Sequence, residues 1–282
     1  MRADRKRLIY LIAGIGVILI LAICLAFYLG SGGPSDGSAN VDTSRGINYI
    51  KTLEGKSPEN VEHILKQQRE QKIQAMREQR LQELESGDIS VWTLFEDYVI
   101  LGDSRAVGFY YYEFLPENRV LAESGATIAR LEELIPDIVE LNPSNIFLCY
   151  GINDVSIGLW PTPQDYVEDF RRIVLALQSK LPDATVYISS ILPARDPAFE
   201  TASVWREIPN YSAKVKEMCS SMARCFFVDN DAICAQYADL WDIDGIHVQR
   251  DFYDHWAANL IAEVYNAGLV SELDNDQTTR EE

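Results

Sequence analysis

Residues 102–104, Gly-Asp-Ser, are the first point in the chain where the residue types suit nucleophilic chemistry. They follow residues 98–101, a short apolar run of β-forming residues that predicts a buried strand. Ligands bind at the carboxyl ends of strands in an open parallel sheet, so a serine hydroxyl here is well placed for attack. The alternative is that Asp103 or Ser104 only caps the next helix. A motif this short does not decide between the two.

A serine nucleophile needs a base, usually a histidine, and an acid that orients the base. The globular part of the chain has two histidines, His247 and His255. His247 lies in a polar loop, and Asp244 precedes it by three residues, so one tight turn could bring the carboxylate to the imidazole. His255 lies inside a helical pattern, and we interpret it as a residue without a catalytic role.

Acyl transfer also needs hydrogen-bond donors aimed at the developing negative oxygen. Gly125 is a candidate because glycine allows close approach of the backbone to a substrate. The Asn153 side chain is a neutral donor, and the backbone N–H of Ser104 is a third candidate. The alternative interpretation is that Gly125 and Asn153 only form turns.

The elements that must position these residues alternate between strand-like and helical patterns. Such alternation predicts an α/β fold with a doubly wound parallel sheet of five strands, covered by helices on both faces. The predicted strands are residues 98–101, 119–122, 145–150, 185–192 and 225–228, and the main helical patterns are residues 128–141, 163–181, 203–222 and 252–269.

Four short motifs resemble, in order and approximate spacing, those of the SGNH (GDSL-type) hydrolase superfamily. They are Gly-Asp-Ser at 102–104, glycine at 125, Gly-x-Asn-Asp at 151–154 and Asp-x-x-His at 244–247. The resemblance implies a flavodoxin-like fold and a serine esterase. Ser104 would be the nucleophile, His247 the base and Asp244 its orienting acid, and Ser104 N–H, Gly125 N–H and the Asn153 side chain would form the oxyanion hole.

Arg105 stands where the namesake motif of that superfamily has leucine. We expect it to bind a polar or anionic part of the substrate, or to pair with a nearby acid such as Asp154.

Two other hydrolase classes fit the sequence less well. The G-x-S-x-G elbow is absent, because Ala106 stands two residues after Ser104. A two-metal phosphoesterase would need more ligands than Asp103, Asp154, Asp244 and one histidine supply. We therefore expect no metal and no cofactor.

The N-terminal region predicts a membrane anchor. A basic flank precedes an uncharged apolar segment long enough to span a bilayer, whereas the apolar region of a cleaved signal peptide is about 7–15 residues long. The basic flank should stay in the cytoplasm, which puts the rest of the chain outside. The predicted parts are a basic flank (1–7), a transmembrane anchor (8–29), a flexible linker (30–56), a spacer helix (57–87), the hydrolase domain (91–270) and a disordered acidic tail (271–282).

Charge and cysteine content limit the partners. The formal net charge is −18 and no basic stripe exists, so nucleic acid is excluded as a partner. We expect a monomer that contacts the membrane through its N-terminal segment. Cys219, Cys225 and Cys234 lie close together in the sequence and could supply one disulfide, although sequence does not give connectivity.

These features predict an extracellular, membrane-anchored esterase that removes acetyl or another small acyl group from an envelope carbohydrate. Tyr110–Tyr112 and Trp160 could stack on sugar or belong to the core. Two alternatives stay open. One is an acyltransferase that acts on the same glycan with the same triad, and the other is a catalytically silent glycan-binding domain.

Overall fold

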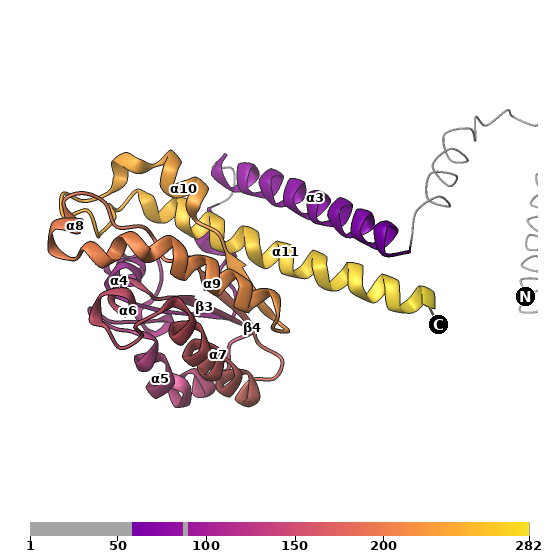
Figure 1. Cartoon of the computed structure of the whole chain (residues 1–282), viewed down its shortest axis with the longest axis horizontal. Helices are drawn as coiled ribbons and strands as arrows, with labels where there is room; N and C mark the ends of the chain where they lie inside the picture. Colours follow the sequence, from indigo (N-terminus) through magenta and orange to yellow (C-terminus); the bar gives the residue numbers. More distant parts are fainter. Residues whose placement is uncertain (1–57, 87–89, 282) are drawn as a thin grey trace, which may run out of the picture. The chain divides into compact units, whose positions relative to one another are not determined.

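The computed structural model describes residues 58–86 and 90–281, and a five-stranded parallel sheet forms the centre of its globular part (Figure 1). The strand order is β2-β1-β3-β4-β5, and every neighbouring pair is parallel. The predicted doubly wound α/β architecture is confirmed. The strands are β1 (Tyr98–Gly102), β2 (Val120–Ala122), β3 (Asn145–Cys149), β4 (Thr185–Ser189) and β5 (Cys225–Val228).

Both faces of the sheet are buried, which is why its strands read as continuous apolar runs rather than as alternating ones. In β1, Val99 and Leu101 belong to the core under α5, α7 and α9, whereas Ile100 belongs to the core under α4 and α11. Side chains of a strand alternate between the two faces, so one strand contributes to both cores. The helices are α3 (Pro58–Glu85), α4 (Ser104–Tyr111), α5 (Ile128–Leu141), α6 (Ile152–Ile157), α7 (Pro163–Lys180), α8 (Ala198–Thr201), α9 (Ile208–Ser220), α10 (Asp231–Gln236) and α11 (Phe252–Glu281), with 3₁₀ turns η1 (Val91–Leu94), η2 (Glu117–Arg119), η3 (Ser203–Glu207) and η4 (Ala238–Leu240).

The structure corrects two expectations about helices. The helix predicted over residues 203–222 is divided into η3 and α9, because Pro209 lacks a backbone N–H and fits best in a first helical turn. Residues 271–281 continue α11 instead of forming a disordered tail. No proline follows Phe252, and extending a helix that has already formed fixes one residue for each hydrogen bond gained.

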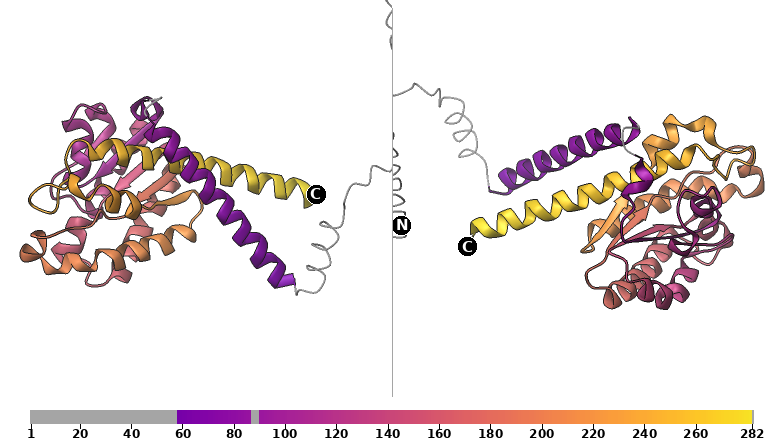
Figure 2. Two further views of the ribbon diagram at one scale, coloured as in Figure 1. Left: turned by 90° about the horizontal axis from the view of Figure 1, so that it is seen from above. Right: turned by 180° about the vertical axis from the view of Figure 1, so that it is seen from behind.

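Helices α3 and α11 cross at an angle when seen from above (Figure 2, left), and a polar network joins them. Arg77 donates to Glu263 at 3.1 Å and to Asn259 Oδ1 at 2.5 Å. The Asn259 amide in turn donates to Asn230 Oδ1, directly after β5. These contacts tie α3 to the sheet through residues that are far from it in sequence.

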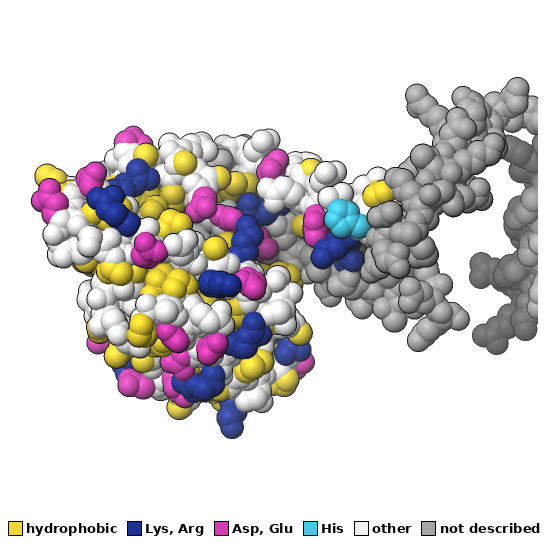
Figure 3. All heavy atoms as spheres, viewed as in Figure 1, with side chains coloured by type: hydrophobic (Ala, Val, Ile, Leu, Met, Phe, Trp, Pro, Cys, Tyr) yellow, Lys and Arg dark blue, Asp and Glu magenta, His cyan; other side chains and the backbone are white. Residues whose placement is uncertain are grey.

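Across residues 58–86 and 90–281, none of the helices combines the length and the apolarity needed to cross a membrane. The predicted flank, anchor and linker at residues 1–56 lie outside the described residues, so they stay predictions. Figure 3 shows acidic and basic side chains interspersed over one face of the molecule.

Candidate active site

The candidate site lies where the direction of chain winding reverses. From β1 the chain moves to β2 at the edge, then crosses back to β3 on the other side of β1. The carboxyl ends of β1 and β3 are therefore adjacent and open, which is the usual binding site of this topology. Ser104 follows β1, and Asn153 follows β3.

The turn that presents Ser104 depends on close packing at Gly102. A Cβ at Gly102 would collide with the Cys149 carbonyl of β3 and with the Ala106 side chain. Asp103 is the N-cap of α4, and its carboxylate accepts from the Arg105 N–H at 3.0 Å. Ser104 is consequently the first helical residue, and N–H groups at that position have no partner within the helix. The cap belongs to Asp103, which leaves the Ser104 hydroxyl free to face His247.

Ser104, His247 and Asp244 form a hydrogen-bonded chain. Ser104 Oγ lies 2.9 Å from His247 Nε2, and His247 Nδ1 lies 2.6 Å from Asp244 Oδ2. With the Nδ1 proton donated to the carboxylate, Nε2 is left to accept the serine proton. The side chains of His247 and Asp244 are 42% and 43% exposed, so the base is open to solvent.

The loop of Asp244 fixes both the acid and the base. Asp244 Oδ1 accepts from the backbone N–H groups of Ile246 and His247. Partial burial acts to raise the pKa of Asp244, but the His247 ring and these two N–H groups outweigh it and lower the pKa. Asp244 therefore stays ionised and can stabilise the imidazolium that forms when the base takes a proton.

Gly125 and Asn153 meet at the turn after β2. Gly125 is exposed with a φ of 80°, a conformation that L side chains rarely adopt, and open space surrounds it. Asn153 Nδ2 donates to the Ala126 carbonyl at 2.9 Å. An amide carries two N–H donors, so one can hold this turn while the other stays available for an oxyanion.

The structure contradicts the prediction that Arg105 binds substrate. Its side chain is 3% exposed; Nε and Nη2 pair with the Asp103 carboxylate at 3.3 and 3.4 Å, and Nη1 donates to the Leu192 carbonyl. Its partner is thus Asp103 and not Asp154. The physical reason is that Asp103 is buried and a buried carboxylate requires a charge partner. The two-residue spacing of acid and arginine was the signal in the sequence.

Asp154 is a second buried acid that we did not assign to the site. Its Oδ1 accepts from the Ile128 N–H at 2.9 Å, and its Oδ2 has no partner. Burial raises its pKa to about 7. The signal in the sequence was its place directly after Asn153 in Gly-Ile-Asn-Asp.

The remaining candidate residues lie elsewhere. His255 stacks on Tyr237, and Trp160 is buried, whereas Tyr111 is 70% exposed. Cys219 and Cys225 lie with their sulfurs 3.7 Å apart as free thiols, and Cys234 is also free. Within the described parts of the chain, no three His, Cys, Asp or Glu side chains are grouped so that they could hold a metal ion.

Comparisons with known proteins agree with this fold and show the family. The GDSL-like Lipase/Acylhydrolase family matches residues 100–255, more than half of the chain, so the chain belongs to this family of ester hydrolases. A GDSL-like lipase from Bacteroides thetaiotaomicron has 17% identity and a TM-score of 0.51, covering 60% of this chain and 88% of its own. A lipase/acylhydrolase from Enterococcus faecalis has 16% identity and a TM-score of 0.48, covering 60% of this chain and 95% of its own. A search of curated proteins found no match.

Proposed function

We propose that the chain is an extracytoplasmic serine esterase that removes acetyl or another small acyl group from an envelope carbohydrate. The observation that carries the chemistry is the chain of hydrogen bonds from Ser104 Oγ through the His247 ring to Asp244. Each residue of this chain has the partner that an activated serine requires.

In the proposed reaction, Ser104 Oγ attacks the ester carbonyl carbon while His247 Nε2 takes the hydroxyl proton. The carbonyl oxygen becomes an oxyanion near Ser104 N–H, Gly125 N–H and the Asn153 amide. The carbon–oxygen bond of the ester then breaks, and His247 returns the proton to the leaving sugar hydroxyl. Water, activated by the same histidine, hydrolyses the acyl-serine and restores the free enzyme.

The choice of a small acyl group on a polymer has two supports. His247 is exposed to solvent, and an exposed base suits a bulky substrate better than a buried base would. In addition, Pro193–Tyr211, the segment after β4, is mixed polar and aromatic rather than a long apolar insertion. A lipase-like site would gain about 0.8 kcal/mol for each methylene buried. Arg105 does not support this choice, because its side chain is buried and pairs with Asp103.

A fluorophosphonate probe tests the catalytic serine. We expect the probe to label the wild-type chain and not Ser104→Ala. We also expect the esterase activity to survive EDTA. Equal labelling of both proteins would end the serine-esterase proposal, and activity lost to EDTA and restored by zinc or manganese would favour a metal-dependent phosphoesterase.

The substrate is tested by kcat/KM for p-nitrophenyl acetate, butyrate and octanoate, together with acetate release from acetylated envelope glycan. We expect the acetate ester to be the best of the three and acetate to be released from the glycan. Rates that rise with chain length and no acetate from glycan would point to a lipid or thioester instead. Transfer of the acyl group to an added glycan acceptor would indicate an acyltransferase.

A further inference from the structure

Asn153 and Asp154 hold the same short turn from the same side. Asn153 Nδ2 donates to the Ala126 carbonyl at 2.9 Å, and Asp154 Oδ1 accepts from the Ile128 N–H at 2.9 Å. This turn immediately follows Gly125 and leads into α5. Thr127, the N-cap residue of α5, makes no side-chain cap hydrogen bond. Asp154 therefore supplies, from another element, the acceptor that the start of α5 lacks.

The other carboxyl oxygen of Asp154 lies among buried polar groups that also lack partners. Asp154 Oδ2, Tyr150 Oη and Tyr166 Oη are all buried without a hydrogen bond. Burial is the largest cause that raises the pKa values of both tyrosine hydroxyls. The charge of nearby Asp154 raises them further. An ionised carboxylate in this position would be a buried charge without compensation.

The charged groups around Asp154 leave it without a cation of its own. Asp103, the N-cap of α4, and Arg105, in its first turn, both act electrostatically on Asp154 and already pair with each other at 3.3 Å. The other titratable groups near it are phenols that stay neutral at ordinary pH: Tyr150 after β3, Tyr166 on α7 and Tyr211 on α9. Around Asp154 there are thus two carboxyl groups, Asp103 and Asp154, and one cationic side chain, Arg105. Asp154 is the carboxyl group without a cationic partner, so it is the one that takes up a proton.

We propose that Asp154 is a positioning residue of the oxyanion hole, which holds the turn after Gly125 and supports catalysis in its protonated form. A protonated Asp154 keeps its Oδ1 acceptor for the Ile128 N–H and removes the buried charge that has no compensating partner. Deprotonation places a negative charge next to Asn153, where the oxyanion develops, and so opposes the transition state. This inference rests on the proposed esterase activity.

Two substitutions at this position separate the hydrogen bond from the charge. Asp154→Asn keeps an acceptor oxygen and cannot ionise, so it imitates the protonated acid. Asp154→Leu has a similar branched shape and has no acceptor. Asp165→Leu is the matched control, because Asp165 caps α7 in the same domain but does not contact the turn after Gly125. The full chain is assayed in detergent with p-nitrophenyl acetate.

We expect Asp154→Leu to lower kcat by about 10–100-fold with KM within twofold, and Asp165→Leu to leave kcat unchanged. Asp154→Asn should keep kcat within about threefold of wild type at pH 6. Above pH 7 the wild-type kcat should fall, while the kcat of Asp154→Asn should not. Combining Asp154→Leu with Asn153→Ala should cost little more than Asn153→Ala alone, because both act through one turn.

Several results would overturn the inference. They are an unchanged kcat in Asp154→Leu, an alkaline limb that persists in Asp154→Asn, and full additivity in the double variant. If Asp154→Leu does not fold, the pH profile of Asp154→Asn decides alone. A wild-type chain that cleaves no ester would instead count against the proposed function, so the two failures are distinguishable.

Discussion

Asn153 is the side chain whose removal should separate transition-state stabilisation from substrate binding. Its amide already holds the Ala126 carbonyl, so its second N–H has a fixed direction. Asn153→Ala should lower kcat by about 10²–10³ with little change in KM, as measured by steady-state kinetics. Asn210→Ala, an exposed amide on α9, is the control. A loss confined to KM would assign Asn153 to substrate binding.

Residue types and spacing predicted which side chains meet, but not how each charge is neutralised. Ser104, His247 and Asp244 could be recognised because the chemistry of a serine nucleophile requires one base and one acid. For Arg105, the two-residue spacing from Asp103 was a signal of pairing, but whether the side chain turns inward depends on the packing of the next strands, here on the Leu192 carbonyl after β4. Asp154 was missed for the same reason, since its partner Ile128 belongs to a separate helix.

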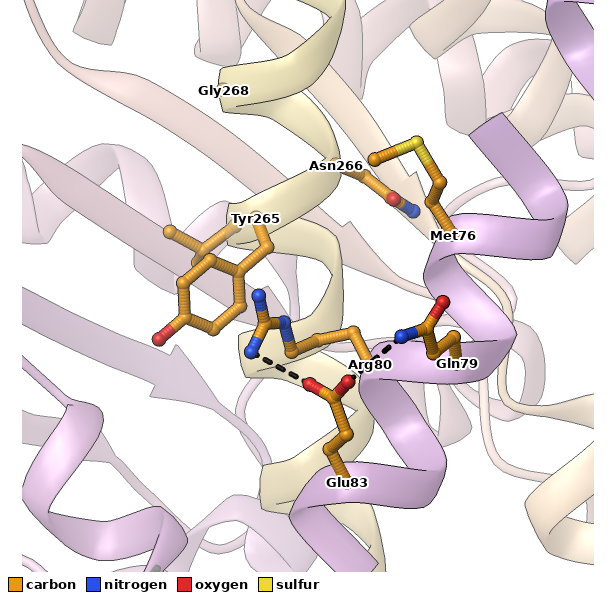
Figure 4. A pocket seen from close by; sticks show the side chains of 8 residues that line it. Met76, Gln79, Arg80, Glu83, Tyr265, Asn266 and Gly268 are labelled. Atoms are coloured by element: carbon orange, nitrogen blue, oxygen red, sulfur yellow. Dashed lines mark hydrogen bonds and ion pairs between the residues drawn. The ribbon is translucent and has the colours of Figure 1, made fainter. Parts of the chain in front are cut away.

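The pairing of α3 with α11 gives a prediction at the scale of elements. Arg77 is the partner of Glu263, whose pKa burial raises and Arg77 acts to lower. Arg77→Met should leave Glu263 and Asn259 without their donor and should reduce the free energy of unfolding by about 1–3 kcal/mol. Arg80→Met is the matched control: Arg80 stacks on Tyr265 and pairs with the exposed Glu83 (Figure 4), so its loss should cost under about 1 kcal/mol.

Urea unfolding of the full chain measures both variants. If Arg77→Met and Arg80→Met lowered the free energy of unfolding equally, the special contribution of the Arg77–Glu263 pair would be contradicted. The groove beside Arg80, about 320 Å³ and lined by Met76, Gln79, Glu83 and residues 264–266 and 268, gives Arg80→Met room to relax (Figure 4).

The elements themselves were predictable because each strand is buried on both faces and reads as an apolar run. The positions at which these elements end were less predictable. The predicted strand over residues 185–192 includes the apolar Ile191 and Leu192, yet β4 ends at Ser189. Beyond it, the Ile191 N–H is held by Ser212 of α9 and the Leu192 carbonyl by Arg105 of α4. Hydrogen bonds to side chains from distant helices cannot be predicted from the periodicity of one segment.

At the scale of the molecule, Asp154 makes stability depend on pH. Its folded pKa of about 7 exceeds its ordinary value of 3.8, so the folded state retains a proton that the unfolded chain releases. Relative to Asp154→Asn, the wild-type free energy of unfolding should therefore fall by about 2–4 kcal/mol between about pH 4 and pH 7. Above pH 7 the difference between the two proteins should stay constant. Urea unfolding of both proteins at pH 5, 6, 7 and 8 measures this difference. A constant difference across that range would contradict it.

The proposed topology is a prediction about the complete chain. With the basic flank at residues 1–7 inside, added protease should digest the hydrolase domain on intact protoplasts. A cytoplasmic protein, which should be degraded only after lysis, is the control. Protection of the domain until lysis would reverse the orientation.

The antiparallel contact of α3 with α11 also has a mechanical meaning. Force that enters α3 along its axis would act as shear on Arg77 and its two partners, in parallel, rather than peeling a strand from the sheet. The hydrogen bonds continue from Asn259 to Asn230, after β5. Force from the predicted N-terminal anchor would therefore reach the sheet beside β5 as well as along the backbone from α3 to β1.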